Sequence, residues 1–327
     1  MFFRFIKTSA AILCAGAAPL LAQAQDYPAQ PIQVVIPYAP GGGTDVVMRP
    51  LAAELGERLK QPVLLDHRGG AGGNIGAQFT AKAQPHGYTL LAANNSHVIN
   101  PFIYKNPGYD LATDFAPVTV LATAPLVVVV HKSSPIQTLR DFVELARRNP
   151  GKLNFGSAGV GTPGHLAPLL FNKLAGIQLV HIAYKGSGPA VMAQLSQQFE
   201  IQFATPAVAG PHIKSGELRA LAVTSGKRFV ALPHVPTIAE SGIPGLADYD
   251  QAIWWGLLAP ARTDPKVLDK LNAQATAILR TPRFAELLLS QNMVPAPTSR
   301  AEFQALIRSD QQKWEALVRE YGITAEQ

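Results

Sequence analysis

Two glycine-rich stretches hold the residues best suited to bind a ligand. Residues 36–45 read Ile-Pro-Tyr-Ala-Pro-Gly-Gly-Gly-Thr-Asp, and residues 156–166 read Gly-Ser-Ala-Gly-Val-Gly-Thr-Pro-Gly-His-Leu. Each follows an apolar run and precedes a helical pattern, with Thr44 and Thr162 placed to N-cap the helices. Glycine lets a ligand approach the main chain, and the N–H groups at a helix N-terminus attract anions. Since neither stretch contains Arg or Lys, we expect main-chain and hydroxyl groups to hold an acid, although tight turns between strand and helix would give the same pattern.

Competing enzyme motifs are incomplete. Gly159, Gly161 and Gly164 match the spacing of a dinucleotide fingerprint, but no acidic residue follows about 20 positions later. Thr162 stands where a phosphate-binding loop needs its lysine. No Gly-x-Ser-x-Gly elbow exists, and the eight histidines and the single Cys form no metal-binding pattern. We therefore expect no enzyme, no cofactor and no metal, while a catalytic group assembled from distant segments stays open.

The N-terminus has the pattern of an export signal. Arg4 and Lys7 precede the apolar residues 10–21, and Ala22-Gln23-Ala24 is a small-x-small cleavage site. The apolar run is shorter than the roughly 20 residues of a membrane span. Leu13 before Cys14 is too large for a lipoprotein motif. The sequence predicts cleavage after Ala24 and location in the periplasm, where nucleotide cofactors are not available.

Composition fits a folded, exported protein that binds no nucleic acid. The 327 residues are 47% hydrophobic and 15% charged, which is ample for a buried core. The net charge of +6 falls to +4 (6 − 2) when the two basic residues of the signal are removed. The remaining basic residues are scattered and form no stripe along which a phosphate backbone could run.

Strand and helix patterns alternate along most of the chain. Apolar runs predict strands at 32–36, 63–65, 88–92, 126–130, 153–155, 179–183, 201–203, 218–223 and 253–259. Helical patterns cover 45–60, 139–148, 164–174, 189–197, 265–279, 282–290 and 300–321. Such alternation indicates an α/β protein with doubly wound parallel sheets. The four valines at 127–130 suit a strand that is covered on both faces.

A set of short motifs resembles the extracytoplasmic solute receptors of tripartite tricarboxylate transporters, the Bug or TctC family. The motifs follow one another in order over nearly the whole chain after residue 24. Besides the two glycine-rich stretches, they are Tyr-Pro at 27–28, Gly-Ala-Gly-Gly-Asn-Ile-Gly-Ala at 70–77, Gly-Tyr-Thr-Leu-Leu at 87–91, Asn-Pro at 100–101, Tyr-Lys-Gly at 184–186, Leu-Arg-Ala-Leu-Ala-Val-Thr-Ser at 218–225 and Trp-Gly-Leu at 255–257.

The resemblance implies a two-lobed periplasmic-binding-protein fold of the type II, or Venus-flytrap, kind. Each lobe would be a doubly wound sheet flanked by helices. Residues 25–124 and 251–327 would form lobe 1, and residues 125–250 would form lobe 2. The implied ligand contacts lie between the lobes: Tyr38, Gly42, Gly43, Asp45, Asn95 and Ser96 in lobe 1, and Ser157, Gly161, Thr162, His165, Tyr184, Lys185 and Thr205 in lobe 2.

Several of these residues have an alternative role. Asp45 would repel an acid, so it either stabilises the first helical turn or orders the glycine loop and a bridging water. His165 either donates to the ligand or serves packing and capping. Lys185 is either the partner of a second carboxylate or an exposed residue at the rim. Tyr38 either offers its ring and hydroxyl or packs in the core.

One departure from the family bears on the ligand. Many members have Phe-Asp-Asn where this chain has Phe203, Ala204 and Thr205. Loss of that acid removes a partner for a substrate ammonium group, so the resemblance implies an aliphatic or aromatic mono- or dicarboxylate rather than an acidic amino acid. The expected function is that of a monomeric periplasmic protein that delivers such a molecule to membrane transporter subunits. A ligand-sensing subunit of a two-component system and a secreted hydrolase are the alternatives.

Overall fold

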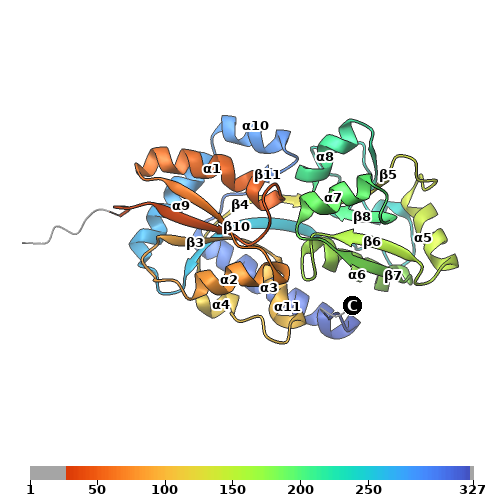
Figure 1. Cartoon of the computed structure of the whole chain (residues 1–327), viewed down its shortest axis with the longest axis horizontal. Coiled ribbons are helices and arrows are strands. Elements are labelled where there is room, and N and C mark those ends of the chain that lie inside the picture. The colour runs from red at the N-terminus through yellow and green to blue at the C-terminus, as the bar shows by residue number, and fades with distance from the viewer. Residues whose placement is uncertain (1–26, 325–327) are drawn as a thin grey trace, which may run out of the picture.

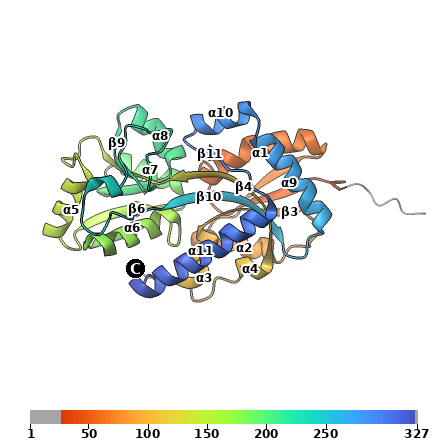
Figure 2. The same ribbon diagram turned by 180° about the vertical axis from the view of Figure 1, so that it is seen from behind.

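The structure is a computed structural model that describes residues 27–324, and it has two lobes, each built on one sheet. The lobes lie side by side along the long axis of the molecule, as Figure 1 and the reverse view in Figure 2 show. Lobe 1 contains a six-stranded sheet of order β11-β4-β10-β3-β1-β2, and lobe 2 a five-stranded sheet of order β7-β6-β8-β5-β9. The two-lobed α/β fold expected from the sequence is thus confirmed.

Lobe 1 places helices on both faces of its sheet. Its strands are β1 (Ile32–Ile36), β2 (Val63–His67), β3 (Thr89–Asn94), β4 (Phe115–Pro125), β10 (Ala252–Pro260) and β11 (Val294–Pro295). Its helices are α1 (Gly43–Leu59), the 3₁₀ helix η1 (Ala71–Gly73), α2 (Asn74–Ala81), α3 (Ser96–Ile103), α4 (Leu111–Asp114), α9 (Pro265–Leu279), α10 (Pro282–Ser290) and α11 (Arg300–Tyr321).

The two faces of the lobe 1 sheet contribute to separate cores. In β1, successive side chains point to opposite faces. Val34 belongs to the core that also contains Met48 of α1, whereas Val35 belongs to the core that contains Ala77 of α2 and Phe303 of α11. Both valines are fully buried, as expected for a strand covered on two sides.

Lobe 2 is smaller and follows the same plan. Its strands are β5 (Val127–His131), β6 (Leu153–Ser157), β7 (Leu179–Ala183), β8 (Ile201–Ala204) and β9 (Leu218–Val223). Its helices are α5 (Leu139–Arg148), α6 (Pro163–Ala175), α7 (Ser187–Leu195), α8 (Pro206–Lys214) and the 3₁₀ helix η2 (Ala239–Ser241). The valines at 127–130 are all buried, which confirms the expectation of a doubly covered strand.

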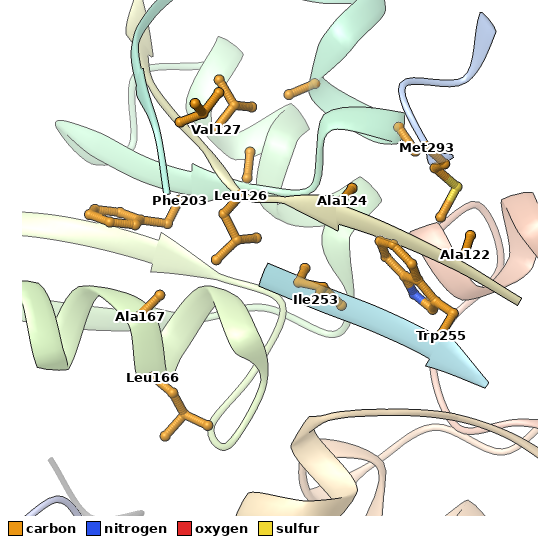
Figure 3. Packing of buried hydrophobic residues seen from close by; sticks show 14 of the residues in the cluster. Ala122, Ala124, Leu126, Val127, Leu166, Ala167, Phe203, Ile253, Trp255 and Met293 are labelled. Atoms are coloured by element: carbon orange, nitrogen blue, oxygen red, sulfur yellow. The ribbon is translucent and has the colours of Figure 1, made fainter. Parts of the chain in front are cut away.

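The chain passes between the lobes twice, and the two passages are bonded together. β4 continues through Leu126 into β5, and the segment after β9 returns to lobe 1 as β10. The Thr224 hydroxyl donates to the Gln251 carbonyl (2.7 Å) and accepts from the Leu126 N–H (2.8 Å). Figure 3 shows Leu126 and Ile253 among apolar side chains between the lobes. The two passages thus lie among apolar side chains and are joined to each other by hydrogen bonds.

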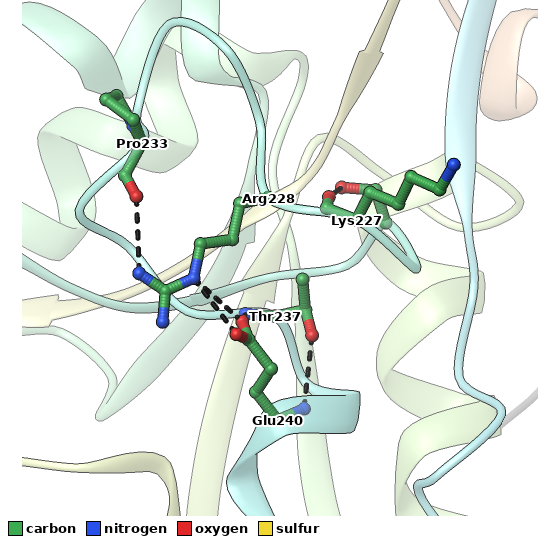
Figure 4. A network of polar contacts seen from close by, with 6 residues as sticks. Lys227, Arg228, Pro233, Thr237 and Glu240 are labelled. Atoms are coloured by element: carbon green, nitrogen blue, oxygen red, sulfur yellow. Dashed lines mark hydrogen bonds and ion pairs between the residues drawn. The ribbon is translucent and has the colours of Figure 1, made fainter.

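A polar network fixes the long segment that leads back to lobe 1. Arg228 donates to Glu240 (3.0 Å) and to the Pro233 carbonyl (3.3 Å), while Glu240 accepts from the Thr237 N–H (2.7 Å), as Figure 4 shows. This hydrogen bond from the Thr237 main chain is the main reason why the pKa of Glu240 is lowered. These hydrogen bonds hold the conformation of the segment between β9 and β10, which contains little regular secondary structure.

The structure corrects some expectations about the elements. The sheets are mixed rather than parallel throughout, because β10 runs antiparallel to β3 and β4, and β5 runs antiparallel to β8 and β9. The prediction of Thr44 as N-cap was wrong: α1 begins two residues earlier than predicted, at Gly43, and Gly42 is its N-cap. Thr162 is the N-cap of α6 as predicted.

Candidate ligand-binding site

Two adjoining cavities lie between the lobes and have Tyr38, Ala39 and Ala158 in both of their walls. The larger, here called the outer chamber, has a volume of about 710 Å³ and is lined by Tyr38, Ala39, Pro40, His67, the run 69–73, Tyr104, 158–160 and 184–186. The smaller, here called the inner recess, has a volume of about 40 Å³ and is lined by Tyr38, Ala39, 42–45, Asn94, Ala158, 162–164, Ser187, Gln202, Phe203, Thr205, Ile253 and Trp255.

The inner recess lies between the N-termini of α1 and α6. The N-cap of α1, Gly42, has no side chain with which to cap the helix, and the side chain of Thr162, the N-cap of α6, forms no capping hydrogen bond. The positive ends of two helix dipoles therefore meet at the recess, which favours a negative charge there. Gln202 also lines it; this side chain is 2% exposed, and its Oε1 has no hydrogen-bond partner among the described residues. Oε1 is an acceptor and therefore needs a donor such as water, whereas the NH₂ group of the same amide is the part that can donate to an acid.

Asp45 lines the recess, but its carboxylate is hydrogen-bonded to neighbouring protein groups. Its carboxylate pairs with Arg49 (2.8 Å) and with His67 Nε2 (2.8 Å), and accepts from the Gly41 N–H (3.2 Å). Burial raises the pKa of Asp45, but the hydrogen bonds from Arg49, His67 and Gly41 outweigh it, so the pKa is lowered overall. The carboxylate orders the first glycine loop, and its charge is compensated by its neighbours.

Three tyrosine rings line the outer chamber, and their hydroxyl groups already have partners. The Tyr38 hydroxyl donates to Asn94 Oδ1 (3.1 Å), that of Tyr104 to the Val160 carbonyl (2.9 Å), and that of Tyr184 to Gln198 Oε1 (2.9 Å). Burial raises the pKa of Tyr38 to about 12, which keeps its phenol neutral. The tyrosines thus present mainly their rings to the chamber.

The two lobes touch across the cleft. The Tyr104–Val160 hydrogen bond joins lobe 1 to lobe 2. Gly72 has φ +65°, and a Cβ added there would collide with the Val160 carbonyl oxygen. Gly161 has φ +78°, and its added Cβ would collide with Asn100 Oδ1. The absence of side chains at these two positions is what lets the lobes approach so closely.

Most of the side chains and glycines predicted for the site line one of the two cavities. Tyr38 lines both, Tyr184 and the exposed Lys185 line the outer chamber, and the residues found at the inner recess are Gly42, Gly43, Asp45, Thr162 and Thr205. Their role in binding stays a prediction.

The structure places the other predicted residues behind these walls. The amide of Asn95 donates to the Ala252 carbonyl (3.0 Å), and Asn95 lines a separate small cavity near Leu126. Ser96 is fully buried. The N–H of Gly161 donates to His165 Nδ1 (3.2 Å), so that histidine braces the second glycine loop. Ser157 is 1% exposed and bonds within its own lobe.

A serine and two histidines lie together behind the second loop. Ser157 Oγ is 2.6 Å from His181 Nε2, and the rings of His165 and His181 are 4.2 Å apart. Burial and the neighbouring His165 lower the pKa of His181 to about 3. Within residues 27–324, no carboxylate bonds to His181, and Ser157 reaches neither cavity wall. This cluster supports the loop and lacks the third member of a catalytic triad.

Some residues of the walls were missed by sequence reasoning. Residues 70–73 and Trp255 belong to motifs already noted. Together with Gly69, residues 70–73 make a run of four glycines and one alanine, a composition that indicates a close approach to the main chain. Tyr104, His67 and Gln202 have no motif that marks them, because their place in the walls depends on how α3, β2 and β8 pack.

The part of the chain that the structure describes shows neither a metal centre nor a membrane-spanning helix. Within it, no group of three or more His, Cys, Asp or Glu side chains is arranged to hold a metal ion. None of its helices combines the length and the apolar character needed to cross a bilayer. The predicted signal sequence lies outside the described residues.

Comparisons with known proteins agree with this architecture. Residues 47–323 match the model of the tripartite tricarboxylate transporter family receptor, TctC. The chain is 35% identical over 308 residues to Protein BugT of Bordetella pertussis, covering 94% of this chain and 93% of that one. The solved structure of R. palustris Rpa4515 with adipate is 34% identical, with a TM-score of 0.87 and coverage of 91% and 99%. That of MatC from Rhodopseudomonas palustris with bound malate is 28% identical, with a TM-score of 0.84 and coverage of 89% and 100%.

These matches cover nearly the whole described chain and agree with the two-lobed fold. Relatives and neighbours of this kind are solute-binding receptors. The chain belongs to the TctC family of tripartite tricarboxylate transporter receptors.

Proposed function

We propose that this protein is a periplasmic receptor that binds a small carboxylate between its lobes and delivers it to a tripartite tricarboxylate-type membrane transporter. It is exported and cleaved after Ala24, acts as a monomer, and performs no chemical step. Its lobes are residues 25–124 with 251–327 and residues 125–250. The observation that carries the proposal is the inner recess, where two uncapped helix N-termini and the buried Gln202 converge.

Chemistry and similarity support a carboxylate. An anion is stabilised at a helix N-terminus by main-chain N–H groups and the dipole. Each hydrogen bond to a charged group contributes about 1.5–3 kcal/mol, so a few of them account for micromolar binding, which needs about 8 kcal/mol. Two solved structures of similar sequence were obtained with the carboxylates adipate and malate.

Binding is tested by thermal unfolding with a panel of mono- and dicarboxylates, followed by calorimetry. A ligand at a hundredfold excess over its Kd adds about 2.7 kcal/mol of stability. We expect Gln202→Leu to weaken carboxylate binding at least about tenfold, because it removes polar groups from the recess. Gln194→Leu is the matched control, since Gln194 is equally buried, also has an unpartnered Oε1 and lines neither cavity. Equal affinity in both variants contradicts the assignment of the recess.

Delivery is tested in cells. Deletion of the protein is expected to abolish uptake of the bound acid, with recovery by the wild type and not by Gln202→Leu. Normal uptake together with a changed transcriptional response to the acid supports a sensing subunit instead. Release of acid from a carboxylate ester by the pure protein contradicts the absence of catalysis.

A further inference from the structure

We infer that the ligand carries an apolar body, an aromatic ring or an unsubstituted alkyl chain, which occupies the outer chamber. The inference rests on the proposed function, in which the carboxylate sits in the inner recess. It adds the chemical character of the rest of the molecule, and names the rings of Tyr38, Tyr104 and Tyr184 as the surfaces that recognise it.

The first argument is that the hydroxyl donors of these tyrosines are already used. A phenol has one hydrogen to donate. The three hydrogens go to Asn94, the Val160 carbonyl and Gln198, at 2.9–3.1 Å. A polar substituent on the ligand therefore finds no free hydroxyl donor on these three tyrosines, and against their ring faces it loses its bonds to water.

The second argument is the remainder of the wall. Ala39, Pro40, Ala71 and Val160 add apolar surface between the tyrosines. Of the ionisable groups besides the tyrosines, His67 bonds to Asp45 (2.8 Å), and Lys185 is exposed. An apolar body that displaces water from such a wall gains roughly 25 cal/mol per Å² of surface removed from water.

The third argument is size. The outer chamber of about 710 Å³ lies within the range of about 300–1,000 Å³ typical of pockets that enclose organic ligands. The inner recess, at about 40 Å³, has room for little more than the head of an acid. A four-carbon acid held in the recess leaves most of the chamber wall in contact with water, whereas a ring or longer chain covers it.

The inference is tested by calorimetry with pairs of acids that have the same number of carboxylates. We expect adipate to bind at least about tenfold more tightly than succinate or malate, and benzoate at least about tenfold more tightly than acetate. Succinate or malate binding as tightly as adipate, with acetate equal to benzoate, overturns the inference and leaves the proposed function intact. Failure of all these acids, with binding of uncharged or cationic solutes instead, overturns both.

Variants of Tyr184 separate the ring from the hydroxyl. Its hydroxyl bonds within lobe 2, so removing it leaves the contacts between the lobes unchanged. In Tyr184→Ala we expect the adipate-to-succinate affinity ratio to fall about tenfold. In Tyr184→Phe, which keeps the ring, we expect the ratio to stay within about twofold of the wild type. A fall in Tyr184→Phe as large as in Tyr184→Ala shows that the hydroxyl recognises the ligand, and contradicts the inference.

Discussion

At the scale of single residues, Asp45 shows how a carboxylate can stand in the wall of the proposed anion site. Its carboxylate is held by Arg49 and His67 and accepts the Gly41 N–H. Arg49 and His67 compensate the negative charge of Asp45. The hydrogen bond from the Gly41 N–H fixes the glycine loop whose main chain faces the recess. The sequence left open whether Asp45 stabilises its helix or orders the loop; the hydrogen bond to Gly41 shows the second role in addition to its first-turn position.

Asp45→Asn is expected to lower the free energy of unfolding at pH 7 by about 1.5–3 kcal/mol, the contribution of hydrogen bonds to a charged group. The folded-state pKa of Asp45 is lowered relative to the unfolded value of about 3.9, so its contribution is present above that value and is lost as pH falls through the folded pKa. The difference between variant and wild type should therefore shrink between about pH 5 and pH 2.

Urea unfolding at a series of pH values measures this difference. Asp248→Asn serves as the control, because Asp248 is exposed on the surface of lobe 2. It should match the wild type within about 0.5 kcal/mol throughout. A constant difference between Asp45→Asn and the wild type over the whole pH range would argue against an ionised Asp45 as the source of the stability.

At the scale of elements, local signals in the sequence located most helices and strands. Helix α5 is predicted from its apolar spacing, and it begins with a capping box of Thr138 and Asp141. Helix α11 begins with the predicted capping box of Ser299 and Glu302 and ends at Gly322, as expected. These signals are local because caps and apolar faces involve residues a few positions apart.

Elements without such signals were missed. β4 and the short helices α2, α3 and α8 escaped prediction. In α3 and α8, of eight and nine residues, an internal proline leaves little helical pattern on either side, whereas the longer α1 and α6 were predicted despite their prolines. The same limit applies to the site. Glycine loops at strand ends are visible in a sequence, whereas the meeting of Tyr104 with Val160 depends on how two lobes close.

The glycine run that contains η1 gives a prediction at this scale. Gly72→Ala is expected to weaken ligand binding at least about tenfold, because the added Cβ collides with the Val160 carbonyl and holds the lobes apart. Gly151→Ala is the matched control: φ is +69° at Gly151 and +65° at Gly72, but the space around Gly151 is open. Both variants should lose about 1–2 kcal/mol of stability from the left-handed backbone. Calorimetry that finds equal affinities in both contradicts a role of Gly72 in closure.

At the scale of the whole molecule, two chain passages connect the lobes and a few contacts close the cleft opposite them. Thr224 ties the passages at Leu126 and Gln251 into one unit. Two short passages of this kind are the hinge arrangement of domain closure, so we expect the lobes to open about this unit while each sheet stays intact. The Tyr104–Val160 bond is present when the lobes are together, so it shifts the equilibrium toward the form that encloses a ligand.

Tyr104→Phe is therefore expected to weaken ligand binding roughly 2- to 10-fold, the effect of losing one hydrogen bond of about 0.5–1.5 kcal/mol in the closed form. Small-angle scattering of the ligand-free variant should show a larger radius of gyration. Tyr88→Phe removes a hydrogen bond with the Ala29 N–H inside lobe 1 and should leave binding unchanged. A Tyr104→Phe protein with the affinity and dimensions of the wild type would mean that this contact does not favour closure.

The walls of the inner recess contain no lysine and no arginine among the described residues. Ions in solution screen exposed charges over about 8–10 Å at physiological ionic strength, but they act little on dipoles inside an enclosed pocket. On the proposed function, a receptor that holds its acid with helix ends and amides should therefore keep its affinity when the ionic strength of the periplasm changes. Because no lysine or arginine would hold the acid in the recess, the acid could also leave without breaking a strong ion pair once the lobes separate.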